Sequence, residues 1–198
     1  MKCQEHSVSQ PLVLASASPR RLELLSLLGV PFEVIPSQAE ENDVSGSGRE
    51  RVRVLARRKG EEVFARLPGR AVLAADTLVC VENEVLGKPA DEADAARMIR
   101  LLSGKSHWVY TGVCLLLPDG SVREEVCGTE VCFAELEEEE ILRYAASGEP
   151  LDKAGAYAVQ GRAGAFVRSI HGSPTNVIGL PLETVARMLR EAGWRLFD

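Results

Sequence analysis

Apolar and polar positions follow two periods along the chain, and in the first half they predict strands alternating with helices. Short, almost wholly apolar runs predict buried strands at residues 11–16, 31–36 and 71–76. Leucines at helical spacing after Ser18 and Pro19 predict a helix that ends at Gly29. Apolar positions among charged ones predict a second helix over residues 49–66. This order is typical of an α/β protein.

The second half of the chain predicts mostly antiparallel strands. Residues 77–89 form a predicted hairpin turning at 82–84, and residues 107–136 form a longer one around Pro118-Asp119-Gly120. Three further helices are predicted at residues 91–102, 137–147 and 182–192. Residues 149–181 are rich in glycine and proline and are expected to be mostly irregular. We therefore expect a mixed β-sheet with helices packed against it.

The sequence contains no repeat, low-complexity block or linker, so we expect a single domain over residues 11–198. Residues 1–10 are polar and are expected to form a disordered N-terminal tail. This segment lacks the apolar region of a signal peptide, and no apolar stretch approaches the roughly 20 residues of a membrane span. We therefore expect a cytoplasmic protein.

Composition and charge narrow the range of partners. The 198 residues include 23 basic and 29 acidic ones, which gives a net charge of −6. This balance argues against general binding to nucleic acid or to an anionic membrane, because both favour a basic surface. The five cysteines contain no C-x-x-C pair, so we expect reduced thiols rather than a zinc site or disulfides.

Two arginines stand where a helix should disfavour them. Arg20 and Arg21 follow Ser18 and Pro19 at a helix start, whose free N–H groups and dipole already carry positive charge. A bound phosphate would explain them, because the N–H groups, both guanidinium groups and the Ser16 hydroxyl could all act on one anion. The alternative is two solvated arginines on a surface helix.

Carboxylates could supply a metal site or a base. Asp76 ends an apolar run, and ligand sites in α/β sheets lie beyond the carboxyl ends of strands. It could bind Mg²⁺ or activate water, or it could simply be a turn or cap aspartate. Glu40 and Glu41 could help to hold a hard cation, or they could be a solvated pair.

Other polar residues could complete a site for a phosphorylated ligand. Lys59 and Lys88 are candidate phosphate-binding cations, although each could be a surface lysine. Lys153 and Gln160 lie in a segment of small residues typical of clefts, and the Gln160 amide could bind a base edge or be satisfied within its loop. No P-loop or G-x-S-x-G motif is present. Together these residues indicate a Mg²⁺-dependent enzyme acting on a phosphorylated ligand.

Six segments also carry a resemblance to a known family. In chain order they are SASPRRLELL, AADTLV, GKP, LSGKSHWVYTGV, GEPLDKAGAYAVQG and NVIGLP. Over residues 12–190 they resemble the Maf (septum formation inhibitor) family of nucleoside triphosphate pyrophosphatases. The resemblance implies an elongated mixed sheet with a cleft between two lobes, related to inosine triphosphate pyrophosphatases. It also implies hydrolysis of a nucleoside triphosphate to the monophosphate and pyrophosphate with a divalent metal, Mg²⁺ or Mn²⁺, and a homodimer.

The resemblance implies roles for individual residues. Asp76 resembles the catalytic proton acceptor and, with Glu41, part of the metal site. The residues that resemble the phosphate and metal site are Ser16, Arg21, Glu41, Lys59 and Lys88. The residues that resemble the specificity trio of the dTTP- and UTP-hydrolysing branch are Arg20, Thr77 and Gln160. The branch acting on 7-methyl-GTP has Trp, Gln and Glu there.

Three alternatives remain open at this point. One is a non-catalytic nucleotide-binding regulator of cell division. Another is the same enzyme class acting on a different base, and the third is a small-molecule phosphatase.

Overall fold

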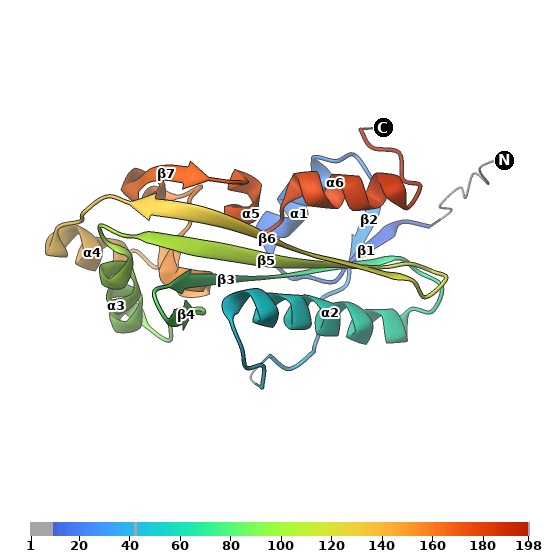
Figure 1. Cartoon of the computed structure of the whole chain (residues 1–198), viewed down its shortest axis with the longest axis horizontal. Helices are drawn as coiled ribbons and strands as arrows, with labels where there is room; N and C mark the ends of the chain where they lie inside the picture. Colours follow the sequence, from blue (N-terminus) through green and yellow to red (C-terminus); the bar gives the residue numbers. More distant parts are fainter. Residues whose placement is uncertain (1–9, 42, 198) are drawn as a thin grey trace.

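The computed structural model describes residues 10–41 and 43–197 (Figure 1). The predicted tail therefore lies outside the described residues, apart from Gln10. Seven strands form one mixed sheet in the order β2-β1-β3-β5-β6-β7, with β4 paired to β3. The strands are β1 (Leu12–Leu14), β2 (Phe32–Val34), β3 (Val72–Val81), β4 (Glu84–Leu86), β5 (Ser106–Leu116), β6 (Val122–Phe133) and β7 (Val167–His171).

Helices cover both faces of this sheet. The α-helices are α1 (Pro19–Ser26), α2 (Gly48–Arg66), α3 (Glu92–Leu102), α4 (Glu138–Ala145), α5 (Pro174–Ile178) and α6 (Leu182–Glu191). Short 3₁₀ turns lie at η1 (Glu149–Asp152), η2 (Ala154–Ala156) and η3 (Arg162–Phe166). Helix α2 runs along one face, whereas α1, α5 and α6 lie on the other (Figure 1).

The central strand β3 has a gap along one of its edges. On one side it pairs with β5 from Val72 to Cys80. On the other side β1 pairs with β3 only at Val72 and Leu73, and β4 pairs with it only from Val79 onward. Between Leu73 and Val79, no strand in the described part of the chain covers this edge. In this stretch Asp76 and Thr77 therefore lie beside a sheet edge that no strand covers, although most of the stretch is buried by other parts of the fold.

Two hydrophobic cores lie on either side of this gap. One is built from β1, α1 and α6 and includes Leu12, Leu25 and Leu189. The other is built from α3, α4 and the far ends of β5 and β6, and includes Ile99 and Phe133. The long strands β3 and β5 contribute residues to both cores, and the molecule has an elongated outline (Figure 1). The expected α/β fold with a mixed sheet and two lobes is confirmed.

The structure corrects two predictions about local structure. The strand predicted at residues 71–76 continues to Val81, so Asp76 lies inside β3 and not at its end. The segment 149–181 was expected to be mostly irregular, yet it contains β7 and α5. Strand β7 is a half-buried strand at the edge of the sheet, and among the described strands its one partner is β6, so its apolar signal is weak. The other predicted strands and helices are present within a few residues of their expected bounds.

Candidate active site

A cleft of about 560 Å³ opens at the gap in the sheet. It is lined by nine residues predicted from the sequence: Ser16, Arg20, Arg21, Glu41, Lys59, Asp76, Thr77, Lys88 and Gln160. These residues come from α1, α2, β3 and four loops, and the fold brings all of them together. Glu40, the other candidate carboxylate, is not part of the lining. Lys153, which the small-residue segment also suggested, lines the same cleft.

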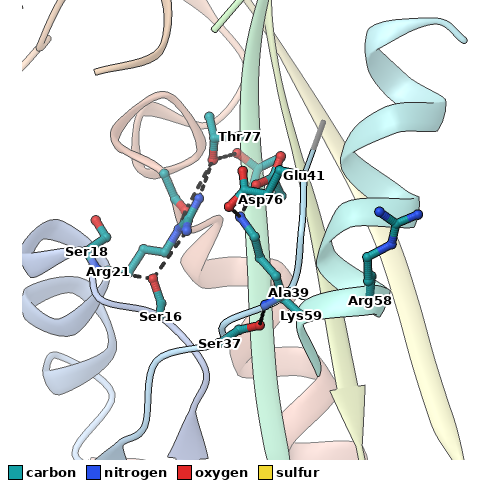
Figure 2. Close-up of polar contacts among 12 residues, drawn as sticks. Ser16, Ser18, Arg21, Ser37, Ala39, Glu41, Arg58, Lys59, Asp76 and Thr77 are labelled. Atoms are coloured by element: carbon teal, nitrogen blue, oxygen red, sulfur yellow. Dashed lines mark hydrogen bonds and ion pairs between the residues drawn. The ribbon is translucent and has the colours of Figure 1, made fainter. Parts of the chain in front are cut away.

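Lys59 bridges two carboxylates at the centre of the cleft. Its Nζ lies 2.6 Å from Asp76 Oδ1 and 2.8 Å from Glu41 Oε1. Asp76 is only 5% exposed, so this ion pair is largely protected from water. Figure 2 shows Lys59 reaching from α2 toward Asp76, with Glu41 beside both. Two carboxylates and a cation are therefore held in direct contact where the sheet is open.

Two glycines allow α2 to lie close enough to the sheet for this contact. A Cβ at Gly112 of β5 would lie 2.2 Å from the Val52 carbonyl oxygen of α2. A Cβ at Gly60, next to Lys59, would lie 2.5 Å from Leu116 Cδ1. Any larger residue at Gly112 would push the helix backbone away from β5, because backbone atoms cannot rotate aside as a side chain can.

An arginine clamp holds the loop that carries Glu41. Arg58 of α2 donates a hydrogen bond of 2.9 Å to the Glu40 carbonyl oxygen and forms an ion pair with the Asp43 carboxylate. The Arg58 hydrogen bond keeps the pKa of Asp43 below its usual range. Since Arg58 is bound on both sides of Glu41, it restricts where that carboxylate can lie. The sequence pattern did not single out Arg58.

Arg21 connects three elements below the cleft. It donates hydrogen bonds to the Gly179 carbonyl oxygen (2.8 Å), to Ser16 Oγ (3.3 Å) and to Thr77 Oγ1 (3.1 Å), and Figure 2 shows the last two. Thr77 Oγ1 also shares a hydrogen bond of 2.9 Å with Thr111. Burial lowers the pKa of the Arg21 guanidinium, which nevertheless stays charged because its ordinary pKa is so high.

The N-terminus of α1 is not closed by its own serine. Ser18 occupies the N-cap position, as predicted, but its side chain makes no capping hydrogen bond. Ser16 Oγ instead accepts a hydrogen bond of 3.2 Å from the Ser18 backbone N–H. The side chain of Arg21 folds back onto β3 and α5, so it does not simply project into solvent. These partners resolve the alternative of two solvated arginines for Arg21.

Arg20 belongs to a second charged group at the rim of the cleft. Its Nη1 lies 3.4 Å from Asp152 Oδ2, and Asp152 also pairs with Lys153. Lys153 Nζ donates a hydrogen bond of 2.6 Å to the Glu149 carbonyl oxygen. Sequence reasoning missed Asp152, although its position next to Lys153 in the GEPLDKAGAY segment was a usable signal.

The sequence also did not indicate Arg51, which lines the cleft from α2. Its position could have been found from helical spacing, because Arg51, Leu55 and Lys59 are four residues apart and share one helix face.

The donor set can accommodate a divalent cation. Among the described residues no group of three or more His, Cys, Asp or Glu side chains could hold a metal by itself. However, Glu41 and Asp76 both contact Lys59 Nζ, so the two carboxylates already converge on one cationic group. Two carboxylates completed by phosphate oxygens are a typical Mg²⁺ environment. The residues therefore fit a cation that is bound together with a phosphorylated ligand.

The remaining reactive side chains lie away from this chemistry. Cys80, Cys114, Cys127 and Cys132 are free thiols, and Cys3 lies outside the described residues. Burial raises the pKa of Cys114 to about 12, so it is protonated at neutral pH.

No helix in residues 10–41 and 43–197 combines the length and apolar character needed to cross a membrane.

The fold and the cleft together define the class of the protein. It is an α/β protein with one mixed sheet, a gap along one edge of its central strand, and a cleft at this gap that is lined by cations and carboxylates. The fold is similar to that of the Staphylococcus aureus Ham1 protein, with a TM-score of 0.54 at 16% sequence identity over 92% of this chain and 100% of that one. This likeness concerns the fold alone.

The chain belongs to the family of Maf-like proteins, whose family model matches residues 11–192. It is 50% identical over 191 residues to a protein of Symbiobacterium thermophilum named dTTP/UTP pyrophosphatase, covering 95% of this chain and 97% of that protein. A protein of Thermococcus gammatolerans with the same name is 49% identical, with 94% and 99% of the two chains covered. The family indicated by the six sequence segments is thus confirmed.

Proposed function

We propose that this protein is a nucleoside triphosphate pyrophosphatase that hydrolyses dTTP and UTP to the monophosphate and pyrophosphate with the help of Mg²⁺ or Mn²⁺. The observation that carries this proposal is the contact of Asp76 with Lys59 and, through it, with Glu41 at the opening in the sheet. The relatives named dTTP/UTP pyrophosphatase, at about half identity over nearly the whole chain, support the same class of reaction.

The positive charges of the cleft would bind the triphosphate. Lys88 lies exposed in the cleft lining, and Lys59 lies near the reacting centre. At the start of α1, the N–H groups, Ser16 and the Arg21 guanidinium add donors for phosphate oxygens. These groups would screen the negative charge of the substrate and hold it across the open edge of β3.

The pyrimidine base would lie at the rim formed by Arg20 and Gln160. The Gln160 amide can donate to and accept from the polar edge of a pyrimidine. Thr77 differs from Arg20 and Gln160, because its hydroxyl already forms hydrogen bonds with Arg21 and Thr111. We therefore assign Thr77 a positioning role, in which it sets the orientation of Arg21. A glutamine at this position would not fit the same compact network.

In the proposed mechanism Asp76 orients the attacking water and accepts its proton. The water oxygen forms a bond to the α-phosphorus, the bond from the α-phosphorus to the bridging oxygen breaks, and the electron pair leaves with pyrophosphate. Lys59 and Lys88 stabilise the charge that develops on the phosphate oxygens. A divalent cation held by Glu41 and Asp76 would lower the pKa of bound water and neutralise phosphate charge. This contribution matters because a carboxylate is a weak base at pH 7.

The first experiment compares the products formed from several nucleotides. Wild-type protein, Asp76→Asn and the control Asp119→Asn, which changes an exposed turn residue, are incubated with dTTP, UTP, CTP, dATP, GTP and 7-methyl-GTP in Mg²⁺ or Mn²⁺. Pyrophosphate and orthophosphate are measured separately, and nucleotide binding is measured by calorimetry. We expect pyrophosphate from dTTP and UTP, near-complete loss of turnover in Asp76→Asn with binding partly retained, and normal activity in Asp119→Asn.

Other outcomes would identify the alternatives. Binding without turnover on any nucleotide would favour a non-catalytic regulator of cell division. Orthophosphate released without added pyrophosphatase would favour a phosphatase, and a preference for 7-methyl-GTP would assign a different base. Full activity in Asp76→Asn would remove Asp76 from the mechanism.

We also propose a cytoplasmic homodimer, on the family resemblance alone. Analytical ultracentrifugation of the purified chain tests the dimer, and fractionation of cells expressing it tests the location.

A further inference from the structure

Helix α2 presents two cations to the cleft on one face. Arg51, Leu55 and Lys59 all line the cleft. Residues four apart in a helix lie one above the other, so these side chains form a single stripe. Lys59 is eight positions after Arg51, which places their backbones about 12 Å apart along the helix axis. Lys59 forms ion pairs with Asp76 and Glu41, whereas Arg51 lies at the other end of the stripe.

Arg51 lacks the ion pairs that several other cations lining the cleft form. Its Nε is buried and makes no hydrogen bond, and within the described residues no carboxylate forms an ion pair with it. Arg20, Lys59 and Lys153, by contrast, each pair with at least one carboxylate. A half-buried guanidinium with an unsatisfied donor is unfavourable, because no hydrogen bond compensates for the loss of its hydration. A bound anion would supply the missing acceptor.

The two faces of β3 indicate which part of a nucleotide would reach Arg51. Adjacent residues of a strand point to opposite faces, and here Asp76 contacts Lys59 of α2 while Thr77 contacts Arg21 of α1. The segment that carries Gln160 lies on the Thr77 side, since a Cβ at Gly155 would meet the Val79 side chain.

A nucleotide with its base at Gln160 and its α-phosphate at Asp76 therefore has to cross the open edge of β3. Its outer phosphates then lie on the α2 side, where Leu78 and Arg51 line the cleft. A Cβ at Gly48, the first residue of α2, would lie 2.1 Å from Cys80 Sγ, so the end of α2 that carries Arg51 packs beside Cys80 of β3. The charge of Arg51 also opposes the rise in the pKa of that thiol caused by burial. Arg51 is thus placed beyond Asp76 in the direction in which β3 runs.

We propose that Arg51 binds the β- and γ-phosphates of the substrate, the group that departs as pyrophosphate. The proposal deepens the proposed function and rests on it for the position of the base. A guanidinium can donate two parallel hydrogen bonds to phosphate oxygens, which suits a planar contact with the terminal phosphate groups. Arg51 would also neutralise the charge that pyrophosphate gains when its bond to the α-phosphorus breaks.

The test compares two charge-removing variants on the same helix. Arg51→Gln removes the proposed contact. Arg53→Gln makes the same change at an exposed arginine that does not line the cleft. Circular dichroism checks that both variants fold, and calorimetry measures the binding of inorganic pyrophosphate and of dTMP in the presence of Mg²⁺. Steady-state kinetics with dTTP gives KM and kcat.

We expect Arg51→Gln to weaken pyrophosphate binding about 10- to 100-fold and to leave dTMP binding within about twofold of wild type. Its KM for dTTP should rise, and Arg53→Gln should behave like wild type. Arg51→Lys should bind pyrophosphate with intermediate affinity, and it gives the same comparison should the glutamine variant not fold.

Three results would overturn the proposal. The first is that Arg51→Gln and Arg53→Gln bind pyrophosphate equally well. The second is that the wild type does not bind pyrophosphate. The third is that Arg51→Gln loses pyrophosphate binding and dTMP binding to the same extent. Failure of the proposed function is distinguishable, because the wild type would then bind pyrophosphate through Arg51 yet release none from dTTP.

Discussion

The buried histidine behind the cleft predicts a specific loss of stability in mild acid. His107 of β5 is 1% exposed, and its Nε2 shares a hydrogen bond of 2.9 Å with the hydroxyl of Tyr157, which lines the cleft. Its Nδ1 is buried and makes no hydrogen bond within residues 10–41 and 43–197, and the ring packs edge-on against Phe133 and Tyr157. Burial lowers the pKa of His107 from 6.5 to about 4, because an imidazolium could not be solvated there.

The sign and size of the effect follow from this difference. Below pH 6.5 the unfolded chain binds a proton at His107 that the folded chain does not bind until the pH approaches 4. The free energy of unfolding therefore falls as the pH drops through this range. The contribution lost is about 2 kcal/mol at pH 5, and it approaches about 3 kcal/mol at lower pH.

Urea unfolding at pH 7.5 and pH 5 measures this contribution. Wild type is compared with His107→Gln and with His171→Gln, which changes an exposed histidine of β7. The fall in the free energy of unfolding between the two pH values should be about 2 kcal/mol smaller in His107→Gln than in wild type. His171→Gln should keep the full fall. The same pH dependence in His107→Gln and wild type would refute the reasoning that burial holds His107 neutral.

Two further predictions concern the nucleotide site. Arg58→Ala should release the Glu41 loop and raise several-fold the Mg²⁺ concentration needed for half-maximal pyrophosphate release, with little change in kcat at saturating Mg²⁺, because it removes the clamp and not the ligand. The control is Arg57→Ala, which changes an exposed arginine paired with Glu61. Equal Mg²⁺ titrations for the two variants would contradict the role of Arg58 as a clamp. Arg20→Trp combined with Gln160→Glu should lower the ratio of dTTP to GTP turnover, and an unchanged ratio would count against their role in base selection.

The composition of the cleft was predictable to an unusual extent because its residues occur in local motifs. Ser16, Arg20 and Arg21 cluster at one helix start, and the other predicted residues lie in short segments with recognisable spacing. The chemical type of each residue and the order of the motifs along the chain do not depend on the fold. The residues that form the site could therefore be inferred before the shape of the site was known. Arg51, Arg58 and Asp152 were missed because each looks like an ordinary charged residue on a helix or loop.

The roles of those residues depended on contacts that no local pattern contains. Lys59 meets Asp76 across 17 positions of the chain, and Arg21 meets the Gly179 carbonyl across 158. The sequence pattern placed Asp76 at the end of a strand, whereas it lies inside β3, at an edge that no strand among the described residues covers. A gap between two strands is a property of the sheet's order, which is set by tertiary packing.

The sequence by itself determined the α/β class, most of the strands and helices, the family and the chemical types in the cleft. These follow from hydrophobic periodicity, helix start and stop residues and short motifs, all of which act over a few neighbouring residues. Only the tertiary structure decided that Asp76 and Thr77 face opposite sides of β3 and that Arg21 is a half-buried connector. It also decided that Arg51 has no ion-pair partner among the described residues. Strand order, burial and ion pairing arise when distant segments pack together, and that packing is a property of the whole chain.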